Sequence, residues 1–312
     1  LDESTWSYGS PVSALTVFEN QIDISVEAVP GEDIPRVNVT PLADFFVVDN
    51  WLRTGARTNW SIDRLPGSRQ LILSGTIASG AKRGEQAAVD DPPGFAAAVL
   101  KDALERRGIR ITGGVRTRSW ESGDMSEAPL MPVILASHKS APLVDLLRVV
   151  GKTSRNLYAE MTLREAGLAS TNAADRQTAV RAMVAFLDQA GADTKCCFFQ
   201  DGSGLSRQTL VTPVSTVDLL AHMHGSSLRE HWIGLLPVGA RDGTLTYRMR
   251  GSPLAGRVRA KTGAIAHVAT VSGYANSRVW GEVAFAAMVN NYTGSSGEIW
   301  QMLDKICLAL AE

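Results

Sequence analysis

Three short segments of the chain carry side chains whose types and spacing could do chemistry. The first is Lys261-Thr262-Gly263, at the end of an alternating run of apolar and charged residues that starts at Arg257. This alternation predicts a strand with one buried face, and a second strand follows through Tyr274. An ammonium, a hydroxyl and a glycine in succession can bind a carboxylate while the strand edge pairs with an extended ligand. The same three residues also fit an ordinary hairpin with a surface lysine.

The other two segments add polar groups at short spacing. Ser154-Arg155-Asn156 places a hydroxyl and an amide at positions i and i+2 of a predicted turn into a helix. Serine can relay a proton there and asparagine can donate to a substrate carbonyl, although a serine N-cap beside a polar neighbour fits equally well. Asp201-Gly202-Ser203-Gly204-Leu205-Ser206-Arg207 lacks the glycine spacing of a dinucleotide-binding turn and the lysine of a phosphate loop. Alone, it indicates a tight loop after a strand.

Length and charge bound the possible functions. The 312 residues suffice for one large domain or two ordinary ones. A net charge of −1 gives no reason to expect nucleic acid or an acidic membrane surface as a partner. No apolar run is long enough to span a bilayer, and no signal peptide is visible. Because the chain also lacks an initiator Met, we expect a processed or trimmed product.

The three cysteines, Cys196, Cys197 and Cys307, form neither a disulfide framework nor a zinc-binding pattern. One of the first two could pair with Cys307, and buried free thiols are at least as good an interpretation. The sequence predicts no metal site and no cofactor.

The first part of the chain is predicted to consist mainly of strands. The expected pairs of strands are 11–19 with 21–29, and 59–64 with 70–76. A helix is expected over 95–107, and a short strand over 109–111. Residues 118–130 are polar and are the best candidate for a domain boundary.

From residue 131 on, helices and strands are expected to alternate. Besides the two strands around Lys261, the expected strands are 131–137, 196–200 and 283–290. The expected helices, recognised by amphipathic spacing and by their end residues, are 142–150, 154–166, 175–189, 212–223 and 298–311. Gly167 is expected to stop the second of these helices.

In this order the segments resemble those of a known family. S-x-N at Ser154 followed by K-T-G at Lys261 matches two of the motifs that mark penicillin-binding proteins and serine β-lactamases. With the loop from Asp201 to Arg207 and Ser272-Gly273-Tyr274, the chain most resembles the low-molecular-mass class C penicillin-binding proteins. These are D-alanyl-D-alanine carboxypeptidases and endopeptidases of peptidase family S13. The resemblance runs through nearly the whole chain.

The resemblance implies an α/β (α+β) fold. A transpeptidase-like domain, in which helices flank an antiparallel sheet, carries the site, and mostly-β domains are inserted between its first and second motifs. Residues 1–130 are then expected to be the inserted part. Residues 131–312 are expected to be the later part of the catalytic domain.

The resemblance also implies roles. A serine nucleophile acylates on the penultimate D-Ala carbonyl and releases the terminal D-Ala. Ser154 and Lys261 help pass the proton to the leaving amine, and Asn156 holds the substrate amide. Lys261 and Thr262 bind the terminal carboxylate, which also implies inhibition by β-lactams.

The remaining implied contacts lie on the strand end and the loop. Gly263 lets the ligand backbone approach, and the N–H of Ala264 should supply one oxyanion-hole donor. The implied residues around the pocket for the peptide side chain are Ser203, Gly204, Leu205 and Arg207. Two positions depart from the family pattern. Arg155 replaces the usual Asp, and Ala264 replaces a frequent Thr, which would remove one carboxylate contact.

The family's nucleophile lies in an S-x-x-K motif upstream of the inserted domains, and we expect that segment to be missing here. One S-x-x-K does occur, Ser79-Gly80-Ala81-Lys82. The chemistry needs the serine at a helix start, so that the lysine shares its face, whereas Ser79 follows a predicted strand. We therefore expect penicillin not to label the chain as numbered. Either an upstream segment carries the nucleophile, or the chain is a degenerate homologue.

The implied partners are peptidoglycan stem peptides, β-lactam antibiotics and the missing N-terminal segment, without nucleic acid. The implied location is periplasmic or otherwise extracytoplasmic. Two alternatives stay open. One is a serine β-lactamase or esterase on the same fold, which would turn over penicillin. The other is a non-catalytic cell-wall-binding remnant without a nucleophile.

Overall fold

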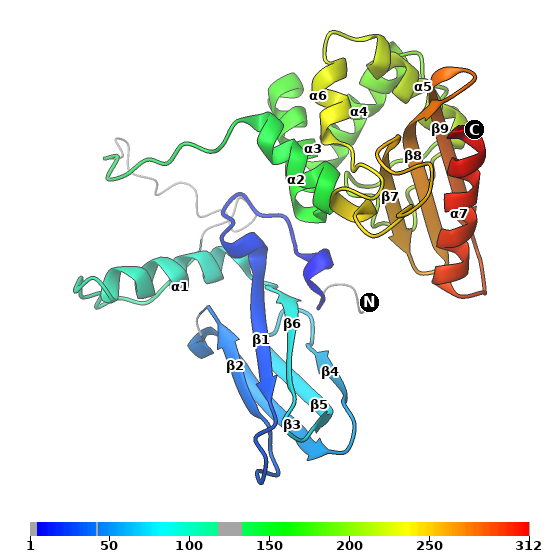
Figure 1. Ribbon diagram of the computed structural model, residues 1–312. Coiled ribbons are helices and arrows are strands. Elements are labelled where there is room, and N and C mark those ends of the chain that lie inside the picture. The colour runs from blue at the N-terminus through cyan, green and yellow to red at the C-terminus, as the bar shows by residue number, and fades with distance from the viewer. Residues whose placement is uncertain (1–4, 42, 118–132, 312) are drawn as a thin grey trace. The chain divides into compact units, whose positions relative to one another are not determined.

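The computed structural model describes residues 5–41, 43–117 and 133–311, so the predicted boundary segment at 118–130 lies outside the described residues. The chain divides into two compact units, residues 1–138 and 139–312. Figure 1 labels the helices and strands of both units. Each unit has a hydrophobic core of its own.

Unit 1 contains two three-stranded sheets. In the first sheet, β1 (Gln21–Glu27) lies between β2 (Arg36–Thr40) and β6 (Lys82–Ala88) and is antiparallel to both. The short 3-10 helices of this unit are η2 (Ser7–Gly9), η3 (Phe18–Asn20) and η4 (Ala43–Phe45).

In the second sheet of unit 1, β5 (Gln70–Ala78) is the central strand. It is parallel to β3 (Val47–Gly55) and antiparallel to β4 (Asn59–Asp63). The helix α1 (Pro92–Glu105) follows, with Asp91 as its N-cap.

Both sheets of unit 1 contribute to one core, because each strand directs alternate side chains to one face. The core side chains of β1 and β5 are almost wholly buried: Ile22, Ile24, Val26, Leu71, Leu73 and Ile77. Phe95 of α1 adds an aromatic ring to the same core, at 5.3 Å between ring centroids from Phe45. The opposite face of each sheet points away from this core.

Unit 2 is built on one antiparallel sheet, in which β8 (Val268–Ser277) lies between β7 (Val258–Ile265) and β9 (Gly281–Asn290). The 3-10 helix η7 (Gly243–Leu245) precedes β7. The helices of this unit are α2 (Leu143–Thr153), α3 (Asn156–Thr171), α4 (Arg176–Gln189), α5 (Pro213–Gly225), α6 (Arg229–Leu235) and α7 (Ser296–Ala311).

Helices cover both faces of this sheet (Figure 1). On one face, Leu303 and Cys307 of α7 are fully buried in the core with side chains of β7, β8 and β9. On the other face, Tyr274 of β8 packs with Leu220 of α5, and its hydroxyl donates to the Leu220 carbonyl at 2.6 Å. The sheet is therefore the middle layer of unit 2.

The sequence predicted elements best where end residues or strand alternation were present. Asp175 caps α4 by accepting the N–H of Thr178 at 2.9 Å, and Thr212 caps α5 by accepting the N–H of Ser215 at 3.1 Å. The predicted strands around Lys261 form β7 and β8. The predicted pair at 59–64 and 70–76 forms β4 and β5.

Four predicted strands are wrong, because these segments pair with no strand edge. They are 11–19, 109–111, the described part of 131–137, and 196–200. Both edges of β1 are occupied by β2 and β6, which leaves no room for the first. Leu135 is 93% exposed, and Phe198 makes only an isolated bridge with Leu210. Residues 131 and 132 lie outside the described residues.

The predicted stop of α3 at Gly167 is also wrong. The helix continues to Thr171, and Gly167 instead packs against Ala179 of α4, where the two Cβ atoms would lie 2.6 Å apart if Gly167 carried one. All three cysteines are free thiols, with Cys307 buried and Cys196 exposed. In the described part of the chain, no helix has the length and apolarity needed to cross a bilayer.

Close packing of α2 against α6 generates a stability prediction. A Cβ at Gly151 would overlap the carbonyl oxygen of Leu235, whereas a Cβ at Gly234 would meet nothing within 4 Å. We expect Gly151→Ala to lower the free energy of unfolding by about 1–3 kcal/mol through overpacking. Gly234→Ala should leave it unchanged or raise it by about 0.5–1 kcal/mol. Urea unfolding of the whole chain, followed by circular dichroism, measures both, and equal stability of the two variants would contradict the packing argument.

Candidate active site

The Ser154-Arg155-Asn156 segment forms the turn between α2 and α3. Ser154 follows the last residue of α2 in the left-handed conformation, with φ 57° and ψ 46°, and its N–H donates to the Val150 carbonyl at 3.1 Å. Arg155 is extended and Asn156 begins α3. Ser154 is thus the C-cap of one helix, not the N-cap of the next, and it lies on an exposed turn.

The side chain of Lys261 joins this turn to the sheet. Its Nζ donates to Oγ of Ser154 at 2.6 Å and to the carbonyl of Thr262 at 2.6 Å. Lys261 and Ser154 are 107 positions apart in the chain, so only the tertiary fold brings them together. The structure therefore places an amine and a hydroxyl in direct contact at the edge of β7.

Burial sets the protonation of Lys261. Loss of surrounding water disfavours the ammonium and lowers the pKa of Lys261 from 10.5 to about 8. A substantial neutral fraction then exists at mildly alkaline pH. Such an amine can exchange a proton with the neighbouring Ser154 hydroxyl, which is the property that a proton relay needs.

An ion pair fixes the end of α2. Nζ of Lys152 lies 2.8 and 3.0 Å from the carboxylate oxygens of Asp242 and donates to the Leu236 carbonyl at 2.6 Å. The same carboxylate accepts the N–H of Val238 at 2.8 Å. Next to it, a Cβ at Gly243 would lie only 2.6 Å from the carbonyl oxygen of Lys152. The end of α2 and the segment that leads to β7 are therefore held together.

The outer edge of β7 is covered at its beginning. Gly239 donates its N–H to the Val258 carbonyl, and Ala260 donates its N–H to the Pro237 carbonyl, both at 2.9 Å. Beyond Ala260, no other strand of the described residues of unit 2 pairs with this edge. Because alternate residues direct their N–H groups to the same edge, the N–H of Ala264 faces it too. An extended peptide can add to β7 here.

Thr262 and Gly263 complete the strand end. The hydroxyl of Thr262 donates to Oγ1 of Thr244 in η7 at 2.8 Å, which fixes its orientation. Gly263 lies opposite Thr270 of β8, and a Cβ on this glycine would be 2.6 Å from Oγ1 of Thr270. A side chain at this position would therefore require the Thr270 hydroxyl to move.

The loop with the sequence D-G-S-G-L-S-R, called the DGSG loop below, is fastened at both ends. Oε1 of Glu160 on α3 accepts the N–H groups of Gly202 and Ser203 at 2.9 and 2.8 Å. At the other end, Nη2 of Arg207 donates to the carbonyl of Ala266, in the turn after β7, at 3.1 Å. The loop therefore borders the end of β7 that carries K-T-G.

The bend of the DGSG loop relies on its own side chains. Gly204 has a φ of 74°, which glycine adopts without strain. The N–H of Leu205 donates to Oγ of Ser203 at 3.4 Å, and Oδ2 of Asp201 accepts the N–H of Ser206 at 2.6 Å. The four predicted pocket residues of this loop thus belong to one ordered turn.

Comparison with known proteins identifies the family. The model of the D-Ala-D-Ala carboxypeptidase 3 (S13) family matches residues 1–306. The chain belongs to this family. It is 30% identical to a D-alanyl-D-alanine carboxypeptidase of Actinomadura sp. (strain R39), over 100% of this chain and 59% of that protein. It is 29% identical to the D-alanyl-D-alanine carboxypeptidase DacB of Haemophilus influenzae, over 68% of this chain and 43% of that protein. The chain thus spans about half the length of these curated relatives.

Solved structures agree at the level of the fold. Penicillin binding protein 4 (dacB) of Haemophilus influenzae, complexed with a novel β-lactam, matches with a TM-score of 0.80 at 25% identity, covering 97% of this chain and 72% of that chain. Another crystal structure of that protein matches with a TM-score of 0.84 at 24% identity, covering 100% and 70%. The predicted α/β fold, with helices that flank an antiparallel sheet, is confirmed.

Four residues around this S13 site had no role assigned from the sequence. They are polar groups that hold the motifs in place: Lys152, Glu160, Asp242 and Thr244. Each acts on a segment distant in sequence, so no local pattern marks its role. The one sequence signal for them was their position in two of the stretches that resemble the family. Lys152 and Glu160 are the ends of K-T-S-R-N-L-Y-A-E, and Asp242 and Thr244 are the ends of D-G-T.

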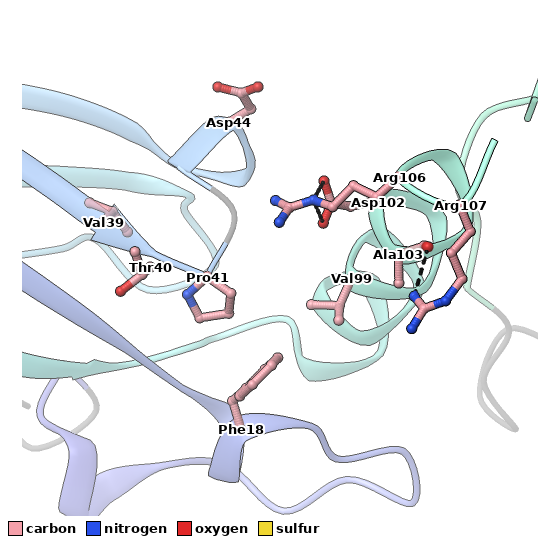
Figure 2. Close-up of a pocket in the computed structure, with 10 residues that line it drawn as sticks. All are labelled: Phe18, Val39, Thr40, Pro41, Asp44, Val99, Asp102, Ala103, Arg106 and Arg107. Atoms are coloured by element: carbon pink, nitrogen blue, oxygen red, sulfur yellow. Dashed lines mark hydrogen bonds and ion pairs between the residues drawn. The ribbon is translucent and has the colours of Figure 1, made fainter. Parts of the chain in front are cut away.

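Other hollows and charge clusters do not compete with this site. Unit 1 has a hollow of about 670 Å³ that contains none of the predicted site residues. Figure 2 shows that Arg106 pairs with Asp102 and that Arg107 donates to the carbonyl of Ala103, while Asp44 lies apart from both arginines. Among the described residues, no three His, Cys, Asp or Glu side chains gather as a metal site would require.

The lowered pKa of Lys261 can be measured directly. In a chain labelled with ¹³C-lysine, we expect one ε-carbon signal to titrate near pH 8, because burial disfavours that ammonium. Lys261→Arg should remove that signal and leave the remaining lysine signals unchanged. The burial argument fails if every lysine signal titrates only at the ordinary value near 10.5.

The link between Glu160 and the DGSG loop is tested by amide hydrogen exchange. Glu160→Ala removes the acceptor of two N–H groups, each bond contributing about 1 kcal/mol. We expect the Gly202 and Ser203 amides to exchange about tenfold faster. Glu160→Gln keeps a carbonyl acceptor and should retain most of the protection. Glu165→Ala, on the exposed side of α3, is the matched control, and exchange rates equal to this control in Glu160→Ala would refute the link.

Proposed function

We propose that this chain forms part of a serine-type D-Ala-D-Ala carboxypeptidase or endopeptidase that acts on peptidoglycan stem peptides and is acylated by β-lactams. The observation that carries the proposal is the 2.6 Å contact between Lys261 Nζ and Ser154 Oγ beside the open end of β7, in a chain of the S13 family. The names of the relatives supply the reaction class, since two of them are D-alanyl-D-alanine carboxypeptidases.

In the proposed reaction, a serine hydroxyl attacks the carbonyl carbon of the penultimate D-Ala. An ester to that serine forms, the C–N bond to the terminal D-Ala breaks, and the leaving amine takes a proton. Lys261 and Ser154, which already share a hydrogen bond, relay that proton to the amine. Water then hydrolyses the ester. The N–H of Ala264 stabilises the oxyanion, because it faces the same strand edge as the N–H of Ala260.

Substrate orientation in the proposed complex comes from both sides of the site. Lys261 and Thr262 bind the terminal carboxylate by charge-assisted hydrogen bonds, and Gly263 leaves room for the ligand backbone. Asn156 holds the amide on the other side of the scissile bond.

The DGSG loop forms the proposed pocket for the peptide side chain. Ser203, Gly204 and Leu205 line it from the bend, and Arg207 lies closest to the strand end through its bond to Ala266. An arginine at this position favours a peptide side chain that ends in a carboxylate or another acceptor.

No residue of this chain is assigned as the nucleophile. Ser79 lies in the turn between β5 and β6, and Lys82 begins β6, so the two do not share a helix face as the S-x-x-K chemistry requires. We further propose that the protein acts outside the cytoplasm, where peptidoglycan is found, and that it needs no cofactor.

Acylation of the natural full-length product by a fluorescent penicillin tests the proposal. We expect Lys261→Ala and Ser154→Ala each to slow acylation by about 10²–10⁴-fold, because each removes a part of the proton relay. Release of D-Ala from a peptide ending in D-Ala-D-Ala should fall in parallel. Ser79→Ala should be acylated at the original rate.

Three outcomes would contradict it. If Lys261→Ala is acylated at an unchanged rate, Lys261 does not relay the proton. If penicillin labels a peptide that contains Ser79, our conclusion that Ser79-Gly80-Ala81-Lys82 is not the nucleophile motif is wrong. Rapid hydrolysis of penicillin in place of a long-lived acyl-enzyme would favour a β-lactamase on the same fold.

A further inference from the structure

The outward face of the β3–β5–β4 sheet in unit 1 carries an exposed tryptophan. Leu52, Ile62 and Leu73 direct their side chains into the core from the three strands. Residues that alternate with them therefore point away from the core. Trp51 is one of these, and it is 64% exposed. Its indole is not among the side chains of the unit 1 core, whereas Trp60 on β4 packs against that core.

The register of the sheet arranges the other outward side chains in rows beside Trp51. Trp51 lies opposite Ser74 of β5, which lies opposite Ser61 of β4. The two flanking rows, read from β3 to β4, are Asp49–Ile72–Asp63 and Arg53–Thr76–Asn59. These nine residues are called the polar sheet face below. With strands about 4.8 Å apart, each row spans about 10 Å, near the length of a disaccharide.

Hydrogen bonds within the polar sheet face orient its groups. The hydroxyls of Ser61 and Ser74 lie 3.0 Å apart, and Ser61 also donates to Asp63 at 3.4 Å. The side-chain amide of Gln70, the first residue of β5, donates to the carboxylate of Asp49. Hydroxyls and carboxylates accept more than one hydrogen bond, so these groups keep capacity for a ligand.

The side chains of the polar sheet face indicate which class of macromolecule it can bind. The centre of a protein interface is depleted in charged residues and built from several large apolar side chains. Here one indole and the smaller Ile72 side chain lie among hydroxyl, amide, carboxylate and guanidinium groups. Nucleic acid requires a positive surface, but two carboxylates, Asp49 and Asp63, outnumber the one guanidinium of Arg53.

A carbohydrate matches both kinds of group. The faces of a pyranose ring are lined by C–H groups that stack on an aromatic plane, and its rim carries hydroxyls that exchange hydrogen bonds with hydroxyl, amide and carboxylate side chains. We propose that the polar sheet face binds a chain of β-linked N-acetylhexosamines, the glycan strand of peptidoglycan, with Trp51 as the stacking platform. The choice of this glycan rests on the proposed function, because stem peptides are attached to such strands.

Binding to glycan strands from which the stem peptides have been removed tests the inference. We expect the chain to be retained on this insoluble glycan and to be released by a soluble hexasaccharide of β-1,4-linked N-acetylglucosamine. Trp51→Ala should weaken binding about tenfold, which is about 1.4 kcal/mol. Trp51→Phe keeps an aromatic ring and should retain most of the affinity. Asp63→Ala should weaken binding without loss of the stacking platform.

Trp280→Ala is the matched control. Trp280 lies in the turn between β8 and β9, is 69% exposed, and belongs to unit 2. We expect its replacement to leave glycan binding unchanged. Failure of the original chain to bind, unchanged binding of Trp51→Ala, or equal losses in Trp51→Ala and Trp280→Ala would each overturn the inference. If Trp51→Ala does not fold by circular dichroism, unchanged binding of Asp63→Ala would overturn it.

This assay is independent of acylation. The glycan carries no peptide, so failure to bind it would leave the proposed carboxypeptidase activity standing. Conversely, loss of the proposed activity would leave measured glycan binding standing.

Discussion

The hydrogen bond between Lys261 and Ser154 is the interaction on which the site depends. A partly buried amine is costly unless it is hydrogen-bonded, and the Ser154 hydroxyl and the Thr262 carbonyl meet that need. The end of α2 is held beside the segment that leads to β7, which keeps Ser154 near Lys261. The ion pair of Lys152 with Asp242 and the close approach of Gly243 to the Lys152 carbonyl both contribute. Contacts remote from the reacting atoms thus help to position the hydroxyl, and burial of Lys261 sets the protonation of the amine.

The DGSG loop, which borders the site, is bonded both to α3 and to the turn after β7. Glu160 holds the DGSG loop on α3, directly after the turn that contains Ser154, while Arg207 ties the loop to the end of β7. The turn before α3, the DGSG loop and β7 are therefore each bonded to the next, and together they surround the open edge of β7. Unit 1 has a different design, in which two sheets share one core and each keeps a face directed away from it. Unit 2 therefore offers a ligand the open edge of β7, whereas unit 1 offers the outward face of a sheet.

Much of unit 2 could be predicted from the sequence, and the failures have physical causes. Alternation around Lys261 predicted β7 and β8 because a strand buried on one face leaves a period of two. Apolar runs such as 133–137 were misread because a strand also needs a partner edge, which local sequence does not encode. Gly167 was misread because glycine serves close helix packing as well as helix termination.

The site itself was predictable to the extent that its motifs are local. Ser154, Lys261 and the DGSG loop were found from short patterns, and the structure places them together. Glu160 was missed as a positioning residue because its two acceptor contacts lie 42 and 43 positions away. No periodicity or cap rule connects residues at that separation.

The left-handed backbone of Ser154 restricts what evolution can place at that position. Residues branched at Cβ are strongly disfavoured at such a φ, so threonine, with the same functional group, is a poor substitute. Glycine and asparagine tolerate the angle but carry no alcohol. Of the two aliphatic alcohols, only serine both adopts this backbone angle readily and offers a hydroxyl to the Lys261 amine. Two independent requirements, one on the backbone and one on the side chain, therefore restrict this position to serine.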